Sequence, residues 1–249
     1  MFIEEKGFKE SVNLCLAIEQ QWLSIQSILA LDLDEHSALQ LLSSILRLMT
    51  TLSRSDAKVL LIQELSSVSE QSTRLPDSID GVVEVSSIKL KCEEVAKKLA
   101  MGPRILAAGL IADPFLSQCY YQQINIYDAA LCNTWRRQSA QEIKLQVQYW
   151  IHSLSVVYQA CELILWMMRS RGSFISIAAD NGYYRDKDVS DLLRLNLVRI
   201  KYLRSDVHPS VSIAHRWLVV TFYSGVWNEG SYQHIQLKDT INAEVALCF

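Results

Sequence analysis

The first hundred residues carry apolar side chains at the three- and four-residue spacing of amphipathic helices. Between positions 8 and 31 the apolar face is formed by Ile18, Trp22, Ile25 and Leu29. A second stripe follows Asp34, whose side chain can accept a hydrogen bond from a free backbone N–H at a helix start. Further stripes cover 85–99 and begin again at Pro103, which the first turn of a helix tolerates. The pattern predicts five helices before position 118.

The clearest helical pattern runs from about 140 to 170, where apolar residues follow the i, i+3, i+4, i+7 rule. Its members are Val147, Trp150, Ile151, Leu154, Val157, Tyr158, Cys161, Ile164, Leu165 and Met168. Gly172 supplies a stop signal after the last of them. We expect one long central helix.

From Asp191 onward the apolar period changes from 3.6 to 2, which is typical of strands with one buried face. Alternating or β-branched segments follow at 193–197, 217–223, 232–238 and 243–249. The run CYYQQINIY at 119–127 also alternates, and we expect a strand there. The charged stretch 181–191 is expected to be a connection whose Gly182 permits a tight turn.

Together these patterns predict an α+β fold with segregated layers. We assign 1–117 and 138–172 to an α-helical domain. The antiparallel β domain is then discontinuous and consists of 118–137 and 173–249.

Composition narrows the classes of partner. The 24 basic and 27 acidic residues give a formal charge of −3, which is too mild to imply nucleic acid or an anionic membrane as an obligatory partner. The N-terminus is acidic, and the longest strongly apolar run, 163–168, is far shorter than a bilayer span, so we expect no membrane insertion. Six widely spaced cysteines without a CxxC motif favour reduced thiols in the cytoplasm.

The sequence offers little that resembles a catalytic centre. With eight glycines there is no GxGxxG or GxxxxGK[ST] motif, and the five histidines include no HExxH, so we expect no cofactor, no metal and no small-molecule substrate. Acids at 186, 188 and 191 leave one alternative open, a hydrolase or transferase with an acidic site between the domains. We expect a protein that is not an enzyme.

Several motifs resemble one family. NGYYRDKDVSDLLRLNL at 181–197, the later HPSVSIAHRWLVVTF and the ending AEVALCF are similar to segments of the ZapD family, and VQYWIHSLSVVYQACELIL looks like that family's long helix. The resemblance implies a helical and a β domain, a homodimer, and binding to the C-terminal tail of FtsZ. It also implies cross-linking of FtsZ filaments at the midcell division site.

The resemblance further implies that basic residues recognise the tail, and here the match is partial. Arg54 corresponds to a basic family position and Arg216 lies beside another, while five positions where relatives can carry Arg or His read Ala17, Pro114, Asn133, Trp217 and Thr221. We therefore select as candidate FtsZ-binding residues Arg54, Arg136, Arg137, Arg216 and Trp217. The changed positions leave a second reading open, a divergent ZapD-like scaffold that binds a different cytoplasmic partner.

The last part of the chain also contains a cluster of basic residues in the sequence. Asp206 is the one acid set against Arg194, Arg199, Lys201, Arg204 and Arg216. The cluster is either a basic patch or the solvated face of a strand.

Overall fold

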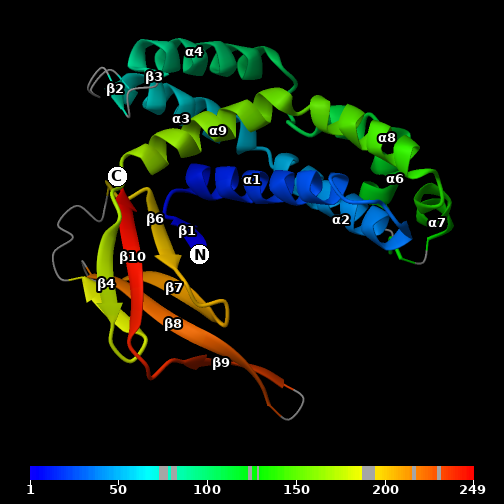
Figure 1. The fold of residues 1–249 in the computed structure, drawn as a ribbon. Coiled ribbons are helices and arrows are strands. Elements are labelled where there is room, and N and C mark those ends of the chain that lie inside the picture. Colours follow the sequence, from blue (N-terminus) through cyan, green and yellow to red (C-terminus); the bar gives the residue numbers. More distant parts are fainter. Residues whose placement is uncertain are drawn as a thin grey trace. The chain divides into compact units, whose positions relative to one another are not determined.

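The computed structural model describes residues 1–72, 78–79, 83–122, 125–127, 129–186, 194–214, 217–228 and 231–249. Two compact units divide the chain (Figure 1). Leu14–Leu165 forms a helical unit, while Met1–Asn13 and Trp166–Phe249 together form a β unit. Helices precede most of the strands along the chain, which confirms the α+β class.

The helices follow one another along the first two thirds of the chain, with one two-strand hairpin between them. They are α1 Glu10–Leu29, α2 Glu35–Leu52, α3 Ala57–Ser72, α4 Val85–Met101, α5 Ala108–Ile111, α6 Pro114–Tyr121, α7 Ala130–Arg136, α8 Ala140–His152 and α9 Ser155–Ser170. The hairpin consists of β2 Ser78–Ile79 and β3 Val83–Glu84.

Two capping boxes explain where α2 and α8 begin. Asp34 accepts a hydrogen bond from the backbone N–H of Ser37, and the Ser37 hydroxyl accepts one from the backbone N–H of Asp34. Ser139 and Glu142 form the same reciprocal pair before α8. Each box satisfies backbone N–H groups that the first turn leaves without a partner. The expected cap at Asp34 is confirmed.

The strand expected at 119–127 is wrong for its first residues, because 119–121 belong to helix α6; residues 123 and 124 lie outside the described part of the chain. Asp113 caps α6 by accepting a hydrogen bond from the N–H of Leu116 at 3.0 Å, and Pro114 occupies the first turn. The described residues of 118–137 therefore belong to the helical unit, where they form the end of α6 and the whole of α7. Alternating tyrosines over a few residues resemble a strand, but the cap and the proline determine the local structure.

The single long helix expected over 140–170 is also wrong, since α8 and α9 meet at a bend of 64°. The Ser153 hydroxyl donates a hydrogen bond to the carbonyl of Trp150 at 2.6 Å, just where the helix stops. A serine bonded to its own backbone in this way competes with the regular helical ladder. The apolar stripe continues through the break because α8 and α9 each bury an apolar face.

Aromatic side chains fill one end of the helical core. Trp150 is 1% exposed and stacks at 6.1 Å, centroid to centroid, on both Phe115 and Trp135. The indole N–H of Trp150 donates to Asp113 at 2.8 Å, and that of Trp135 donates to Gln146 at 2.8 Å. Both buried indoles thus keep a hydrogen-bond partner.

The described residues of the β unit form two antiparallel sheets of four strands each. The first sheet has the order β1-β6-β10-β4, with β1 Phe2–Gly7, β6 Leu197–Tyr202, β10 Ile241–Cys248 and β4 Ile175–Ala179. In the second sheet β8 Trp217–Asn228 pairs along one side with β7 Val207–Ala214, and along the other with β5 Tyr183–Asp186 and then β9 Ser231–Gln236. Strand β1 was not expected from the sequence.

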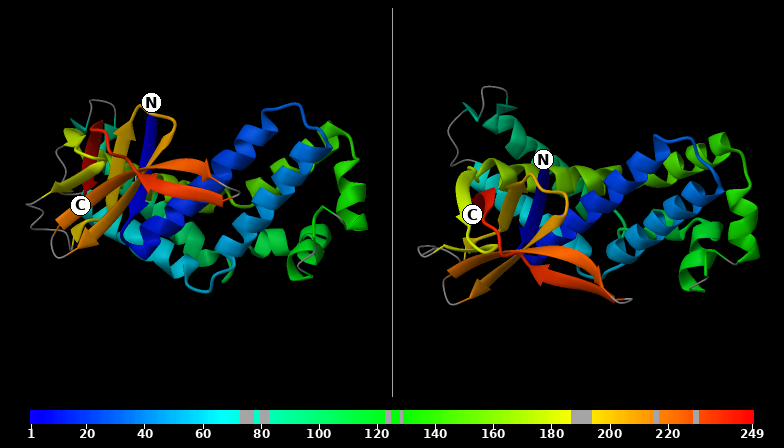
Figure 2. Two further views of the ribbon diagram at one scale, coloured as in Figure 1. Left: turned by 90° about the horizontal axis from the view of Figure 1, so that it is seen from below. Right: turned by 60° about the horizontal axis from the view of Figure 1, so that its bottom comes forward.

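A shared apolar core joins the two sheets face to face. Its fully buried members include Val198 and Ile200 in the first sheet and Leu218, Val220 and Phe222 in the second. In Figure 2 the orange strands β7 and β8 lie across the strands of the first sheet. Because side chains alternate along a strand, the remaining residues of β8 point away from this core.

The Asn181–Gly182 turn brings three segments of the β unit together. Gly182 has φ +67°, and a Cβ there would lie 2.8 Å from the carbonyl oxygen of Leu237. Its carbonyl accepts a hydrogen bond from the N–H of Phe222 at 2.7 Å. The expected turn at this glycine is confirmed, but Arg185 and Asp186 of the expected connection belong to strand β5, and residues 187–193 lie outside the described residues.

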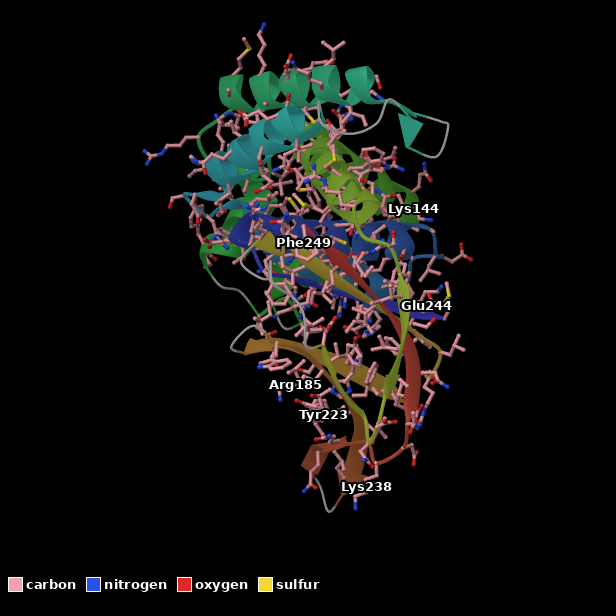
Figure 3. The ribbon with its side chains drawn as sticks, turned by 90° about the vertical axis from the view of Figure 1, so that its left-hand side faces the viewer. Lys144, Arg185, Tyr223, Lys238, Glu244 and Phe249 are labelled. Carbon is pink, nitrogen blue, oxygen red and sulfur yellow. The ribbon has the colours of Figure 1, made fainter. Side chains whose placement is uncertain are left out.

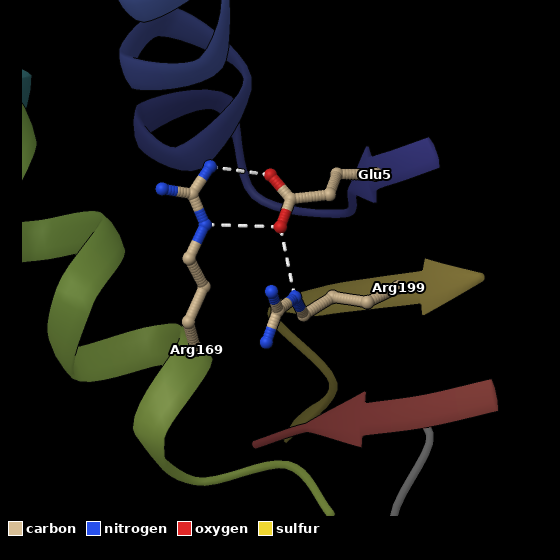
Figure 4. Close-up of polar contacts among 3 residues, drawn as sticks. All are labelled: Glu5, Arg169 and Arg199. Carbon is tan, nitrogen blue, oxygen red and sulfur yellow. Dashed lines mark hydrogen bonds and ion pairs between the residues drawn. The ribbon is translucent and has the colours of Figure 1, made fainter. Parts of the chain in front are cut away.

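A carboxylate network ties the end of α9 to the first sheet (Figure 4). Glu5 of β1 receives both a bidentate contact from Arg169 of α9 and a hydrogen bond from Arg199 of β6 at 2.8 Å. The Glu5 side chain is 14% exposed, so most of its charge is shielded from water and is balanced by these two arginines.

Candidate functional site

Arg54 lies directly after α2, in the turn that leads into α3. Its guanidinium makes two hydrogen bonds to Asp56, at 3.1 and 2.8 Å, and both side chains are exposed. The hydrogen bond from Arg54 holds the pKa of the Asp56 carboxyl below its usual value. Part of the positive charge expected to meet a partner is thus already engaged by a neighbouring acid.

Arg136 and Arg137 lie at the other end of the same helical layer, where α7 ends. The Nε of Arg136 is 3.3 Å from a carboxylate oxygen of Glu35, the first residue of α2. Arg137 is exposed and makes no ion pair with any residue that the structure describes. Since α2 has 18 residues, about 27 Å separates its two ends, and Arg54 does not share a patch with Arg136.

Among the two candidates of the β unit, Arg216 falls outside the described residues, whereas Trp217 begins strand β8. Trp217 is half-buried, and the guanidinium of Arg185 lies 3.6 Å above the centroid of its ring. This is a cation–π contact in which Arg185 remains exposed. Sequence reasoning missed Arg185, because it treated 181–191 as a connection and could not see the pairing of β5 with β8.

Arg185 and Trp217 belong to a larger surface, which we call the outer face of the second sheet. The strand registers and the burial pattern place on it Tyr183, Arg185, His208, Ser210, Ser212, Trp217, Val219, Thr221, Tyr223, His234 and Gln236. None of these residues is buried, and none is acidic. Figure 3 labels Arg185 and Tyr223 on this sheet.

Two histidines lie near Tyr223 on the outer face. His208 Nε2 is 3.0 Å from His234 Nδ1, and the His208 ring stacks on Tyr223 with 5.8 Å between centroids. Together with Arg185 and Trp217, they give the outer face aromatic rings and nitrogen donors. Such a surface suits a partner that presents carboxylates beside apolar side chains.

The five positions where relatives can carry Arg or His are distributed over both units. Trp217 and Thr221 both point to the outer face of the second sheet, and Arg185 pairs with Val219, midway between them. Ala17 and Pro114 lie on α1 and α6, and Asn133 lies on α7. At the outer face, a cation that β8 lacks is therefore supplied by the neighbouring strand β5.

Three residues of the basic cluster noted near the end of the sequence form ion pairs with acids. Arg199 is bound to Glu5, Lys201 lies 2.6 Å from Glu244, and Arg204 lies 2.6 Å from Asp206. Arg199 and Lys201 also lie over the ring of Phe174, at 5.1 and 5.6 Å. These contacts favour the reading of a solvated strand face over that of a free basic patch.

The described residues contain no group of three or more His, Cys, Asp or Glu side chains arranged to hold a metal ion. Of the acids behind the hydrolase alternative, only Asp186 is described; it lies beside Tyr184, whose pKa is raised by burial and then by this carboxylate. Asp188 and Asp191 lie outside the described residues. In the described ranges, no helix alone is both long and apolar enough to cross a bilayer; α8 and α9 meet that test only as a bent pair.

Comparison with known proteins gives one consistent result. The family model "ZapD: Cell division protein" matches residues 16–220. The chain is 27% identical to the cell division protein ZapD of Enterobacter sp. (strain 638) over 220 residues, which cover 84% of this chain and 85% of the relative. It is 30% identical to that of Photorhabdus laumondii over 192 residues, covering 71% and 75%. The chain therefore belongs to the ZapD family of cell division proteins.

Proposed function

We propose that this protein is a non-catalytic cell division factor that binds the C-terminal tail of FtsZ and, as a homodimer, cross-links FtsZ filaments at the cytoplasmic division site. Membership of the ZapD family is the observation that carries the proposal. The motif resemblance described in the sequence analysis implies that members of this family bind FtsZ. The outer face of the second sheet is the surface on which we place tail recognition.

The outer face supports tail binding by its chemistry. Arg185 attracts a carboxylate, and Trp217 beneath it offers a flat apolar surface to the neighbouring side chain of the peptide. None of the described residues of the face is acidic, so none of them repels the carboxylates of the tail. Recognition by one exposed arginine is weak, since an exposed ion pair contributes about 0.2–1 kcal/mol.

A homodimer makes weak recognition sufficient. Two-fold symmetry presents the same face twice, so that each subunit can hold a tail from a different filament. Because a filament displays many tails, a second contact forms at a high effective concentration after the first one. Filament bundling therefore does not require tight binding at any single tail.

The test is co-sedimentation of the purified protein with FtsZ filaments, with and without the FtsZ tail. We expect pelleting and bundling that depend on the tail and that decrease as salt is raised. Arg185→Glu should weaken association about fivefold to tenfold, whereas Arg104→Glu, at an exposed arginine of the helical unit, should leave it unchanged. Charge reversal at Arg54 or Arg216 tests the two remaining sequence candidates in the same assay.

The changed basic positions favour one second candidate, a ZapD-like scaffold with a different cytoplasmic partner. Trp217 and Thr221 stand where relatives can carry basic residues. Tail-independent pelleting, or no pelleting together with a folded dimer, would support this candidate over FtsZ binding. Equal loss in Arg185→Glu and Arg104→Glu would remove the outer face from the proposal.

A further inference from the structure

A concave surface lies on the helical unit, between α2 and α6. We call it the α2–α6 groove; its walls include Leu46, Arg47, Tyr120, Tyr121, Ile126 and Tyr127, and its volume is about 770 Å³. This size is within the range of pockets that hold small ligands or a few peptide residues. None of its lining residues belongs to the outer face of the second sheet.

Arg47 is the one charged side chain among the described residues that line the groove. It is exposed, and its guanidinium makes no ion pair or hydrogen bond with the described part of the chain. The two other arginines beside α2 differ in this respect, since Arg54 is bound to Asp56 and Arg136 lies close to Glu35. Arg47 is held on a rigid helix by the buried Leu48 and Met49 that follow it.

Tyrosines form the opposite wall. Tyr121 is 65% exposed and Tyr127 is 54% exposed, while Ile126 between them in the chain is only 9% exposed. The Asn125 side chain accepts a hydrogen bond from the N–H of Tyr127 at 3.2 Å, which fixes the turn that presents this ring. Exposed tyrosines over an apolar floor are typical of surfaces that bind peptides.

This combination defines the occupant by charge and shape. An arginine with free donors binds a carboxylate, and the tyrosines with Leu46 and Ile126 receive an apolar side chain next to it. A polyphosphate backbone is a poorer match, because the chain has a net charge of −3 and the groove offers one cation. We propose that the α2–α6 groove is a second peptide-docking site, which binds a short segment carrying a carboxylate beside an aromatic or branched apolar residue.

Binding is measured by fluorescence polarisation with a fluorescein-labelled Gly-Asp-Phe-Leu-Asp peptide. The protein is the full chain with Arg185→Glu, so that the outer face of the second sheet contributes little. We expect saturable binding that Arg47→Glu weakens at least tenfold and Arg47→Lys only about twofold to threefold. The matched control is Arg104→Glu, which should leave the affinity unchanged.

Nitration by tetranitromethane, read by mass spectrometry, locates the bound peptide. The peptide should protect Tyr121 and Tyr127, but not Tyr149, which is 76% exposed on α8. Circular dichroism checks that each variant folds, and Arg47→Gln replaces any charge-reversal variant that does not.

Equal weakening by Arg47→Glu and Arg104→Glu would overturn the proposal. So would equal affinity for a Gly-Lys-Phe-Leu-Lys peptide, unprotected tyrosines, or displacement of the peptide by an RNA oligonucleotide at lower concentration than by unlabelled peptide. The inference goes beyond FtsZ binding and fails separately from it. Filaments that pellet with a protein whose groove binds no peptide would leave the proposed function intact.

Discussion

Glu5 shows how one side chain can hold several elements of the β unit. Its carboxylate accepts hydrogen bonds from Arg169 of α9 and Arg199 of β6, while its own backbone belongs to β1. The three side chains are between 14% and 27% exposed. Removing the carboxylate would leave two guanidinium groups close together without a counter-charge, which costs more than an exposed ion pair is worth.

Glu5→Gln is therefore expected to lower the free energy of unfolding by about 2 kcal/mol. The matched control is Glu244→Gln on β10 of the same sheet, where the lost partner is Lys201 and the carboxylate is 38% exposed. That change should cost about 0.5 kcal/mol. Urea unfolding followed by circular dichroism measures both values. Equal costs for the two variants would contradict the role given to Glu5.

At the scale of elements, the start of helix α2 depends on one side chain, Asp34, whose charge changes with pH. Hydrogen bonds from Ser37 lower the pKa of Asp34, so the ionised cap favours the folded chain. A lowered pKa means that this stability is present above the unfolded value of about 3.9 and is lost as the pH falls through the folded value.

Asp34→Asn tests this expectation, because asparagine also caps helices but does not ionise. We expect the wild-type chain to melt at a higher temperature than the variant above about pH 4, and the difference to vanish at lower pH. Asp32→Asn, at an exposed acid with no described hydrogen bond, is the control. A melting-temperature difference that stays constant from pH 2.5 to pH 6 would count against the titrating cap.

Patterns local to an element were predicted well, and contacts between distant segments were not. The apolar stripe of α2 and its cap at Asp34 could be predicted, because each is a pattern among residues that are close together in the sequence. The break between α8 and α9 depends on how Ser153 bonds to its own backbone, and apolar spacing does not report this. Strand β1, with Glu4, Glu5 and Lys6, has no apolar alternation to identify it.

The candidate site divides in the same way. Trp217 could be selected because the family resemblance places it where relatives can carry a basic residue, but Arg185 belongs to the site only through the pairing of β5 with β8. Arg54 and Arg136 are both basic surface residues near α2, and nothing in the sequence shows that they lie at its opposite ends. The pairing register of two strands and the proximity of two side chains depend on contacts between segments that are far apart in the sequence.

For the whole molecule, the main feature is that the helical unit is an insertion within the β unit. The β unit consists of Met1–Asn13 and Trp166–Phe249, and β1 is an edge strand of its first sheet. Each unit has its own buried core, so damage to one sheet should leave the helices folded.

Deleting Met1–Gly7 removes β1 and Glu5 together. We expect amide hydrogen exchange to become at least tenfold faster in β6, which loses its edge partner, and to stay unchanged in α2 and α3. Hydrogen exchange read by mass spectrometry follows both regions in one sample. Loss of protection across α2 and α3 as well would show that the two units do not fold independently.

The position of β10 between β6 and β4 has a consequence during translation. A ribosome makes β1 first, then the whole helical insertion, and only much later the strand that must enter the middle of the first sheet. The nascent chain can complete its helices early, while β1, β4 and β6 wait with unpaired edges. A stop codon shortly before residue 241 would therefore spare the helical unit but leave the first sheet divided at its centre.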